Sequence, residues 1–215
     1  MNTIVNSKQF IASRLGINYE NLSQSYLQKG VALGVQSVIN FPIQANNVAA
    51  PLVTDNLLNL NDEFVVSSYT VFLRTVGSLT PTNLQLLNAL PFTYFDRNVF
   101  TTTGQLNVGA VFNGTLSFTI DRKDFIPAYP CRAFYRVGDT QTAANAFFTA
   151  SAQTLVNSFP LSSYGFVESE PVKITGRQTI DISVELGSSV DFTSAAATQF
   201  AVLELRGFLV VNAKS

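Results

Sequence analysis

The stretch PVKITGRQTIDISVEL, residues 171–186, contains the pattern on which the fold prediction rests. From Ile180 to Leu186 every second residue is apolar, and the residues between them are polar. This alternation is typical of an antiparallel strand with one buried and one solvated face. The short segment Thr175–Arg177 precedes it and contains a glycine. We therefore expect two strands joined by a hairpin turn at Thr175–Arg177.

A second hairpin is predicted in NVGAVFNGTLSFTID, residues 107–121. Asn113-Gly114 is the dipeptide preferred in two-residue type I′ turns. It lies between apolar runs, and Leu116, Phe118 and Ile120 after it fall on one face of a strand. The pattern predicts a turn at Asn113-Gly114 with a strand on each side.

Three further segments are rich in β-branched and aromatic residues and are predicted to be strands. They are residues 31–43, which form the first strand, residues 63–76 and residues 200–212, which form the last. In the last segment, the alternation of apolar and polar residues stops at Gly207. A glycine at this point of a strand indicates a β-bulge.

Helices are predicted only in short segments. Residues 8–15 have apolar side chains at helical spacing and are followed by Gly16, a common end of a helix. Residues 21–28 are expected to form one or two further helical turns. A small inserted helix is expected over residues 82–90, ended by Pro91, because proline cannot continue a helix.

Together these elements predict an all-β protein, an antiparallel β-sandwich of jelly-roll type with short N-terminal helices and a small inserted helix. We expect an N-terminal helical arm over residues 1–30 and a single β-sandwich domain over residues 31–215. An immunoglobulin-type sandwich is disfavoured, because the chain has no Trp and a single Cys.

Composition favours a surface that is covered by partners. Hydrophobic residues make up 47% of the chain and charged residues only 13%, about half of the usual charged fraction. The net charge is −1. The densest group of basic residues, Arg122, Lys123, Arg132 and Arg136, is interrupted by acidic ones. Since binding to phosphate backbones needs clustered cations, direct nucleic-acid binding is not expected.

Residue types also limit the chemistry that is possible. The chain has no His, which removes the most common general base and metal ligand, and one cysteine, Cys131, which can form no internal disulfide or thiolate zinc site. We expect no enzyme activity, no cofactor, no metal and an unreactive, partly buried Cys131. Residues 54–63 contain oxygen ligands without the spacing of a calcium loop. No membrane span or secretory signal is expected.

One carboxylate pair keeps a hydrolase possible. Glu168 and Glu170 alternate in an extended stretch, which places them roughly 7 Å apart on one face. Such separations occur in inverting glycosidases. Ser169 and Pro171 flank an ordinary strand entrance, and we interpret the pair as an exposed strand edge.

The segment FIPAYPCRAFYRV, residues 125–137, is predicted to contact a neighbouring subunit. Two prolines favour an extended loop over residues 125–130, since proline cannot donate to a sheet ladder. The loop leads into an expected strand, CRAFYRV, in which Arg132, Phe134 and Arg136 share a face. Arg and aromatic residues are enriched in interface cores.

In its surface rich in amides and hydroxyls, its low charge and its terminal strand LELRGFLVVN, the chain resembles viral and phage capsid and virion structural proteins built on jelly rolls. The resemblance covers the whole chain and involves no specific motif. It implies a self-assembling capsid subunit in the virion, serving as major shell, vertex or decoration protein, that contacts copies of itself and other virion proteins. The chain departs from the pattern in having no basic arm. The contacts expected between subunits involve Phe10, Ile11, Leu15, Phe125, Tyr129, Arg132, Phe134 and Arg136.

A carbohydrate-binding or adhesin-like β-sandwich is the alternative. It would use exposed tyrosines such as Tyr129, Tyr135 and Tyr164 as a platform for a glycan receptor. A glycan platform requires these tyrosine rings to be exposed. Tyrosines in β-proteins more often pack their rings against the protein and keep one end in water.

Overall fold

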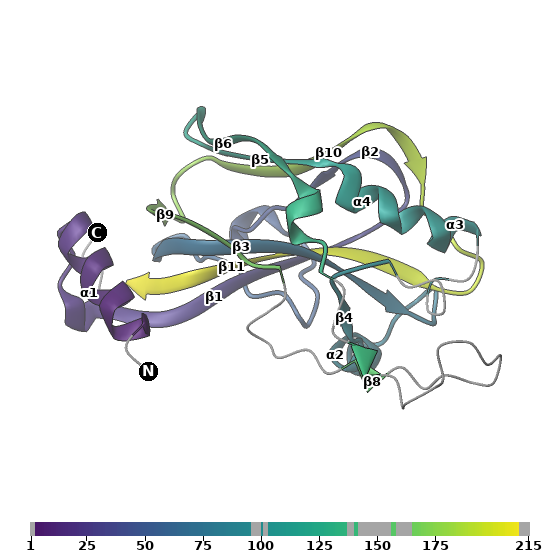
Figure 1. Cartoon of the computed structure of the whole chain (residues 1–215), viewed down its shortest axis with the longest axis horizontal. Coiled ribbons are helices and arrows are strands. Elements are labelled where there is room, and N and C mark those ends of the chain that lie inside the picture. The colour runs from purple at the N-terminus through teal and green to yellow at the C-terminus, as the bar shows by residue number, and fades with distance from the viewer. Residues whose placement is uncertain are drawn as a thin grey trace.

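The computed structural model describes residues 3–95, 100, 103–136, 140–141, 156–157 and 165–210. Two antiparallel β-sheets pack face to face and form the body of the molecule (Figure 1). This architecture confirms the predicted all-β sandwich.

One sheet, called sheet A, is built around its two longest strands. β11 (Thr198–Val210) pairs with β1 (Leu22–Ala32) on one side and with β3 (Glu63–Val76) on the other. The far side of β3 pairs with β4 (Pro91–Phe92) near one end and with β9 (Val167–Thr175) near the other.

The other sheet, called sheet B, contains four strands. Their order is β2 (Val35–Asn40), β10 (Ile180–Asp191), β5 (Thr115–Ile120) and β6 (Lys123–Pro130). A separate two-stranded ladder joins β7 (Thr140–Gln141) to β8 (Val156–Asn157).

Helices occupy the N-terminus and the connections between strands. The α-helices are α1 (Thr3–Leu15), α2 (Asn83–Asn88), α3 (Thr103–Leu106) and α4 (Ala110–Asn113). The 3₁₀ helices are η1 (Tyr19–Asn21), η2 (Ala45–Asn47), η3 (Asn107–Gly109) and η4 (Cys131–Phe134). The predicted inserted helix is confirmed as α2, in which Thr82 and Gln85 form a capping box. Gly16, with φ +64°, follows α1 as predicted.

The antiparallel pairs are nested along the chain. β5 pairs with β6, β3 with β9, β2 with β10 and β1 with β11, so each pair encloses the one before it. The chain is thus folded back on itself as one long hairpin. The ladders β11–β3 and β10–β5 then join these pairs into two sheets.

The core lies between the sheets and confirms the predicted inward faces. Its side chains are buried on β3 and β11 from sheet A and on β5 and β10 from sheet B; they include Tyr69, Val71, Leu73, Leu203, Leu205, Leu116, Phe118, Ile182 and Val184. Asp181 and Glu185 of β10 are exposed, as their alternation with these residues predicts.

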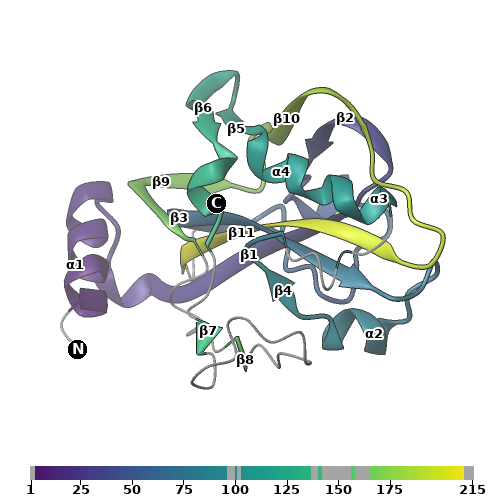
Figure 2. The same ribbon diagram turned by 45° about the vertical axis from the view of Figure 1, so that its right-hand side comes forward.

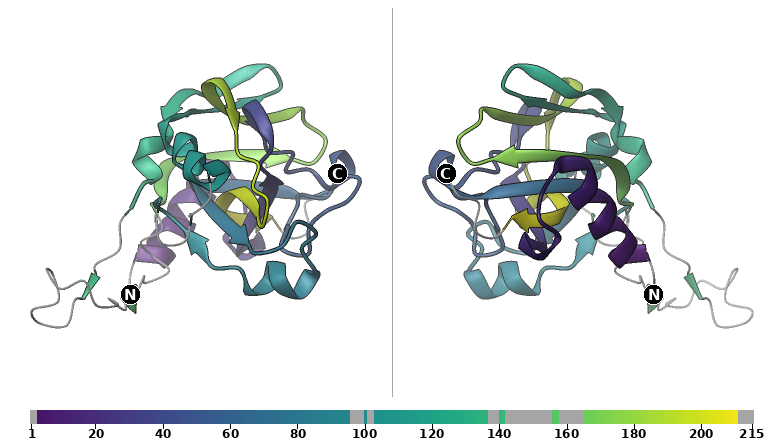
Figure 3. Two further views of the ribbon diagram at one scale, coloured as in Figure 1. Left: turned by 90° about the vertical axis from the view of Figure 1, so that its right-hand side faces the viewer. Right: turned by 90° about the vertical axis from the view of Figure 1, so that its left-hand side faces the viewer.

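Helices also cover both ends of the outer face of sheet A, as Figures 1 and 2 show. At one end, Ile11 of α1 packs against Val65 and Phe208, and α1 stands in front of the sheet in the right panel of Figure 3. At the other end, Leu86 of α2 packs with Phe72 and Val202. β3 is therefore buried on both of its faces.

The predicted helical arm is shorter than residues 1–30. Residues 22–30, part of which was expected to be helical, belong to β1, where they pair with β11 along their whole length. The predicted first strand, residues 31–43, is divided at Leu33-Gly34 between β1 in sheet A and β2 in sheet B. Pairing with distant strands overrides the local pattern in both segments.

The predicted hairpin turn at Asn113-Gly114 is wrong. Asn113 ends α4, and Gly114 is extended, with φ −77° and ψ −179°. A Cβ on Gly114 would lie 2.7 Å from the carbonyl oxygen of Glu185, so this glycine allows a close approach of β10. The turn lies instead at Asp121-Arg122, between β5 and β6, where both residues have the positive φ of a type I′ turn, 49° and 64°.

The predicted hairpin at Thr175–Arg177 is also wrong, although a turn is present. β9 before it belongs to sheet A and β10 after it to sheet B, so the turn crosses from one sheet to the other. A Cβ on Gly176 would lie 1.9 Å from the carbonyl oxygen of Asn59. Glycine is needed here because the turn packs closely against the loop that contains Asn59 and Leu60.

The bulge predicted at Gly207 is confirmed. The register between β11 and β3 shifts between Arg206 and Gly207. A Cβ on Gly207 would lie 1.8 Å from the carbonyl oxygen of Val65, which is far inside van der Waals contact. Only glycine fits the backbone at this position.

We predict that Gly207→Ala destabilises the protein. The added methyl group must displace the backbone of β3, and overpacking of this kind costs about 1–3 kcal/mol. This corresponds to a decrease in Tm of roughly 2–12 °C, measured by thermal denaturation. Gly77→Ala is the matched control, because a Cβ there has no atom within 4 Å. Equal Tm values for the two variants would contradict the tight approach.

Candidate functional site

Helix α1 presents one of its predicted contact residues to solvent and keeps two against its own sheet. Ile11 is buried and Leu15 packs beside it in the cluster with Val65 and Phe208. Phe10 is 55% exposed. Arg14 pairs with Glu170 of β9, with 3.0 Å between Nη2 and Oε2. α1 is therefore held against the sandwich of its own chain, and Phe10 lies on its outward face.

The predicted contact segment, residues 125–137, differs from expectation. Residues 123–130 form β6, an edge strand of sheet B, and Cys131–Phe134 form η4, so the expected loop and strand are both wrong. Proline is tolerated in β6 because an edge strand has one unpaired side. Pro127 falls where the register skips from Tyr129 to Ile126. Val137 lies outside the described residues.

Most aromatic side chains of this segment point into the subunit. Phe134 is fully buried, and the ring of Tyr129 lies 5.8 Å from the rings of both Phe134 and Tyr69. The ring of Phe125 packs edge-on against Phe118 at 5.3 Å. Because Cys131–Phe134 form a 3₁₀ helix, Arg132 and Phe134 do not share a face as they would in a strand.

The arginines of the segment remain on the surface. Arg132 and Arg136 are both exposed. Of the eight predicted contact residues, these two and Phe10 are the exposed ones, so they are the residues available to a neighbouring subunit.

The tyrosines of the predicted glycan platform do not form a shared exposed face. Tyr129 is half-buried among aromatic rings, and Tyr135 packs edge-on against Phe112 at 5.2 Å. Tyr164 lies outside the described residues. These contacts match the packing expected for tyrosines in a β-protein.

A group of exposed leucines surrounds α2 and was not predicted. Leu84 and Leu87 lie three residues apart on the outward side of α2, and Leu79 and Leu90 flank the helix. All four are between 59% and 70% exposed. Leu86 faces sheet A instead. The signal in the sequence was that α2 is apolar on two sides, whereas a surface helix needs only one apolar side.

The carboxylate pair is exposed on an edge strand. Glu168 and Glu170 are both solvent-accessible on β9, and Glu170 is the partner of Arg14. Their surroundings therefore do not distinguish them from surface carboxylates. Within the described part of the chain, no three His, Cys, Asp or Glu residues lie together as a metal site would require.

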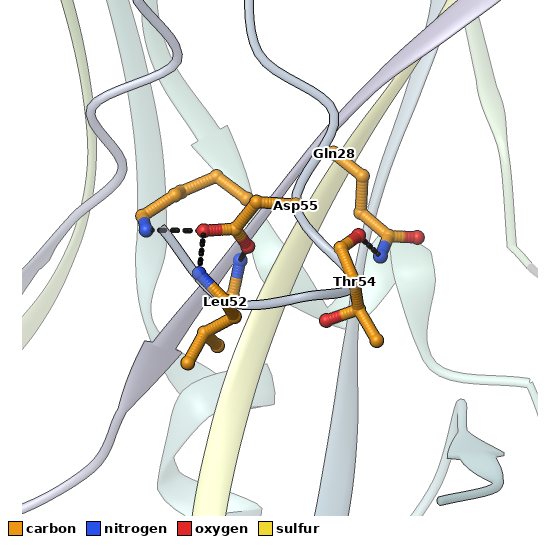
Figure 4. A network of polar contacts seen from close by, with 6 residues as sticks. Gln28, Leu52, Thr54 and Asp55 are labelled. Carbon is orange, nitrogen blue, oxygen red and sulfur yellow. Dashed lines mark hydrogen bonds and ion pairs between the residues drawn. The ribbon is translucent and has the colours of Figure 1, made fainter. Parts of the chain in front are cut away.

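Among the described residues, the most buried ion pair joins Lys29 to Asp55 (Figure 4). Lys29 Nζ lies 2.6 Å from Oδ2 of Asp55, and their side chains are 7% and 0% exposed. Asp55 also accepts hydrogen bonds from the backbone N–H groups of Gly30 and Leu52. Such an extensively bonded carboxylate is stable only while its donors remain in place.

This pair fixes a loop along the side of the sandwich. Asn56 pairs with Gln28 of β1, at the edge of sheet A, and Leu58 pairs with Gln44 shortly after β2, at the edge of sheet B. The buried amide of Gln44 donates to the carbonyl oxygens of Gly176 and Gln178. The loop thereby connects the edges of both sheets, and we assign the Lys29–Asp55 pair a structural role.

Cys131 is fully buried, more deeply than the partial burial predicted, and has no disulfide partner. Burial raises the pKa of its thiol to about 12, against a backbone hydrogen bond at Leu116 that lowers it. Its backbone N–H donates to the carbonyl oxygen of Gly114. This environment favours the thiol over the reactive thiolate.

Comparison of the chain with protein-family models, with curated proteins and with solved structures finds no significant match in any of the three. Among the residues that the structure describes, no helix is long and apolar enough to cross a membrane. Function must therefore be inferred from the geometry of the fold and its surfaces.

We predict that Lys29→Met and Asp55→Ala are both strongly destabilising. Removing one member of a buried pair leaves the other charge or its donors without partners, which costs about 3–5 kcal/mol. Urea denaturation measures the change. Lys173→Met is the matched control, since Lys173 pairs with Glu63 in an exposed setting where a salt bridge contributes at most about 1 kcal/mol. Similar losses in all three variants would contradict the structural role.

We predict that Cys131 resists thiol reagents in the folded protein. At pH 8, labelling by a disulfide reagent should be about a hundredfold or more slower than in the urea-unfolded chain, because the thiolate is the reacting form. The raised pKa also stabilises the fold below pH 9, the ordinary thiol pKa, and this contribution is lost as the pH rises toward 12. Immediate labelling of the folded protein would contradict the buried position.

Proposed function

We propose that this chain is a self-assembling structural subunit of a virus particle, placed in the shell, at a vertex or as a decoration. The observation that supports the proposal most strongly is the exposed leucine group around α2, on a chain with only 13% charged residues. Assembly would bury this group between copies of the chain or against another virion protein.

The proposed fold supports the same class. We propose that the sandwich is a jelly roll, because the nested pairs β5–β6, β3–β9, β2–β10 and β1–β11 contribute four strands to each of the two sheets. Jelly rolls serve in viral capsids, lectins and cupins, among others. The fold limits the class of protein without identifying it, so the function has to be inferred from the residues on the surface.

The physics of the leucine group favours association. Full burial of one leucine side chain contributes about 1.5–3 kcal/mol, and soluble monomers rarely expose large contiguous apolar patches. Leu84 and Leu87 project from a helix held in place by Leu86 and by the capping box of Thr82 and Gln85. A rigid apolar surface of this kind loses little conformational entropy when a partner covers it.

We predict that the purified chain forms oligomers and that Leu84→Asp/Leu87→Asp weakens them. Two charges in an apolar contact should raise the dissociation constant about tenfold or more. Light scattering gives the mass in solution, and negative-stain microscopy shows whether closed particles form.

Leu60→Asp is the matched control, because Leu60 is also exposed but lies in the loop before β3. Its oligomers should resemble those of the unmodified chain. A stable monomer of 23.4 kDa at high concentration would contradict self-assembly. Equal association of the double variant and the control would instead show that α2 does not take part in the contact.

A further inference from the structure

A hollow of about 470 Å³ with two arginines and a glutamate in its lining opens on the outer face of sheet A. It lies between the areas covered by α1 and α2. On β11, the outward-facing Phe208 packs under α1 and Val202 belongs to the α2 cluster, whereas Arg206 and Glu204 between them line the hollow. Its other lining residues include Gln24, Tyr26, Arg74 and Pro91.

Arg74 is a partly buried cation in the wall of this hollow. Its guanidinium lies 5.5 Å from the ring centre of Phe72, and its Nε is buried without a hydrogen-bond partner. Within the described chain, no carboxylate lies within ion-pair distance of it. Burial lowers the pKa of Arg74, although Glu204 and Asp55 act in the opposite direction. A buried donor without a partner costs stability, and a ligand could restore its bonding.

The second arginine of the hollow is already neutralised. Arg206 Nε donates to Oε1 of Glu204 at 2.8 Å, and its guanidinium lies over the ring of Phe166 at 3.7 Å. The lining therefore holds one positive charge in excess, that of Arg74. One negative charge on a ligand would balance it, whereas a second would be repelled by Glu204.

The rim of the hollow offers groups suited to a polyhydroxylated ring. Tyr26 is 46% exposed and lies opposite Arg206 in the pairing of β1 with β11. Gln24, two residues earlier on the same face, is also exposed. An aromatic face packs against the C–H side of a sugar, and amides bind its hydroxyl groups.

We propose that this hollow binds a sugar that carries a single negative charge, with its carboxylate or sulfate ester held by Arg74 and its ring against Tyr26. The planar fork of a guanidinium matches both groups by paired hydrogen bonds. A volume of about 470 Å³ lies within the range of small-molecule sites and is sufficient for a monosaccharide. This inference does not depend on the proposed role in a particle.

The test measures binding of monosaccharides to the full chain by titration calorimetry and saturation-transfer NMR. The probes are methyl glucuronide and the methyl glycoside of N-acetylneuraminic acid for the carboxylate, galactose 6-sulfate for the sulfate, and neutral methyl glucoside. We expect a charged probe to bind at least about tenfold more tightly than the neutral one. The carboxylate and sulfate probes decide which anion is preferred, and either preference supports the site.

Arg74→Gln should abolish the preference for charged sugars. Arg177→Gln is the matched control, because it removes an exposed arginine that is bound to Asn61, outside the hollow, and should leave binding unchanged. If Arg74→Gln does not fold, Tyr26→Ala decides, since this exposed side chain can be removed without opening the core. Tyr26→Ala should weaken every sugar that binds by about tenfold.

Two results would overturn the proposal. The first is equal binding of charged and neutral sugars, or a charge preference that survives Arg74→Gln. The second is an absence of sugar binding together with a change in the mass of the protein in solution for Arg74→Gln or Tyr26→Ala. That second result would assign the hollow to a contact between copies of the chain.

Discussion

The ladder between β3 and β11 is the constraint on which the rest of the structure depends. Its thirteen paired positions run from Thr198 to Val210 and join segments that are far apart in the chain. β1 adds to one side of this pair, and β4 and β9 add to the other. Its inner face contributes to the core between the sheets, and its outer face receives both α1 and α2. The close approach at Gly207 matters for this reason, because any displacement there moves both faces at once.

The second requirement of a sandwich is that its open sides be closed. Here the loop between β2 and β3 connects the edge of sheet A with that of sheet B, through Asn56 on one side and Leu58 on the other. Phe41, Ile43 and Leu58 of this loop are buried in the core and anchor it between the sheets. The buried Lys29–Asp55 pair and the amide of Gln44 add polar contacts that join the loop to β1 and to the turn after β9. Polar groups buried in this way fix one arrangement of the loop, because any shift leaves them without partners.

The sequence predicted correctly which face of the alternating strands is buried. It did not predict where the chain turns or which sheet the next strand joins. Alternation in β10 and β5 located the buried residues correctly, since which side is apolar depends only on spacing. The turns could not be assigned in this way. Asn113-Gly114 has a favoured turn composition, but its glycine is used for a close contact with β10, while Asp121-Arg122 adopts positive φ without any glycine. Whether a strand continues in its own sheet or crosses to the other depends on partners distant in sequence. The predicted contact segment differed for the same reason, because η4 and its buried Phe134 follow from packing against β3 and α4.

The outer face of sheet A explains why an apolar surface and a charged hollow occur on one molecule. A sheet with one solvated face has polar residues at its outward positions. β11 instead has apolar residues at both ends of its outward face, Phe208 and Val202, with Glu204 and Arg206 between them. Apolar ends require cover, which α1 and α2 provide, whereas an apolar helix over the middle would bury unpaired charge. The hollow is therefore the part of this face that the helices of the described residues leave uncovered. Since α2 is apolar on both sides, packing Leu86 on the sheet leaves Leu84 and Leu87 exposed on the other side of the helix.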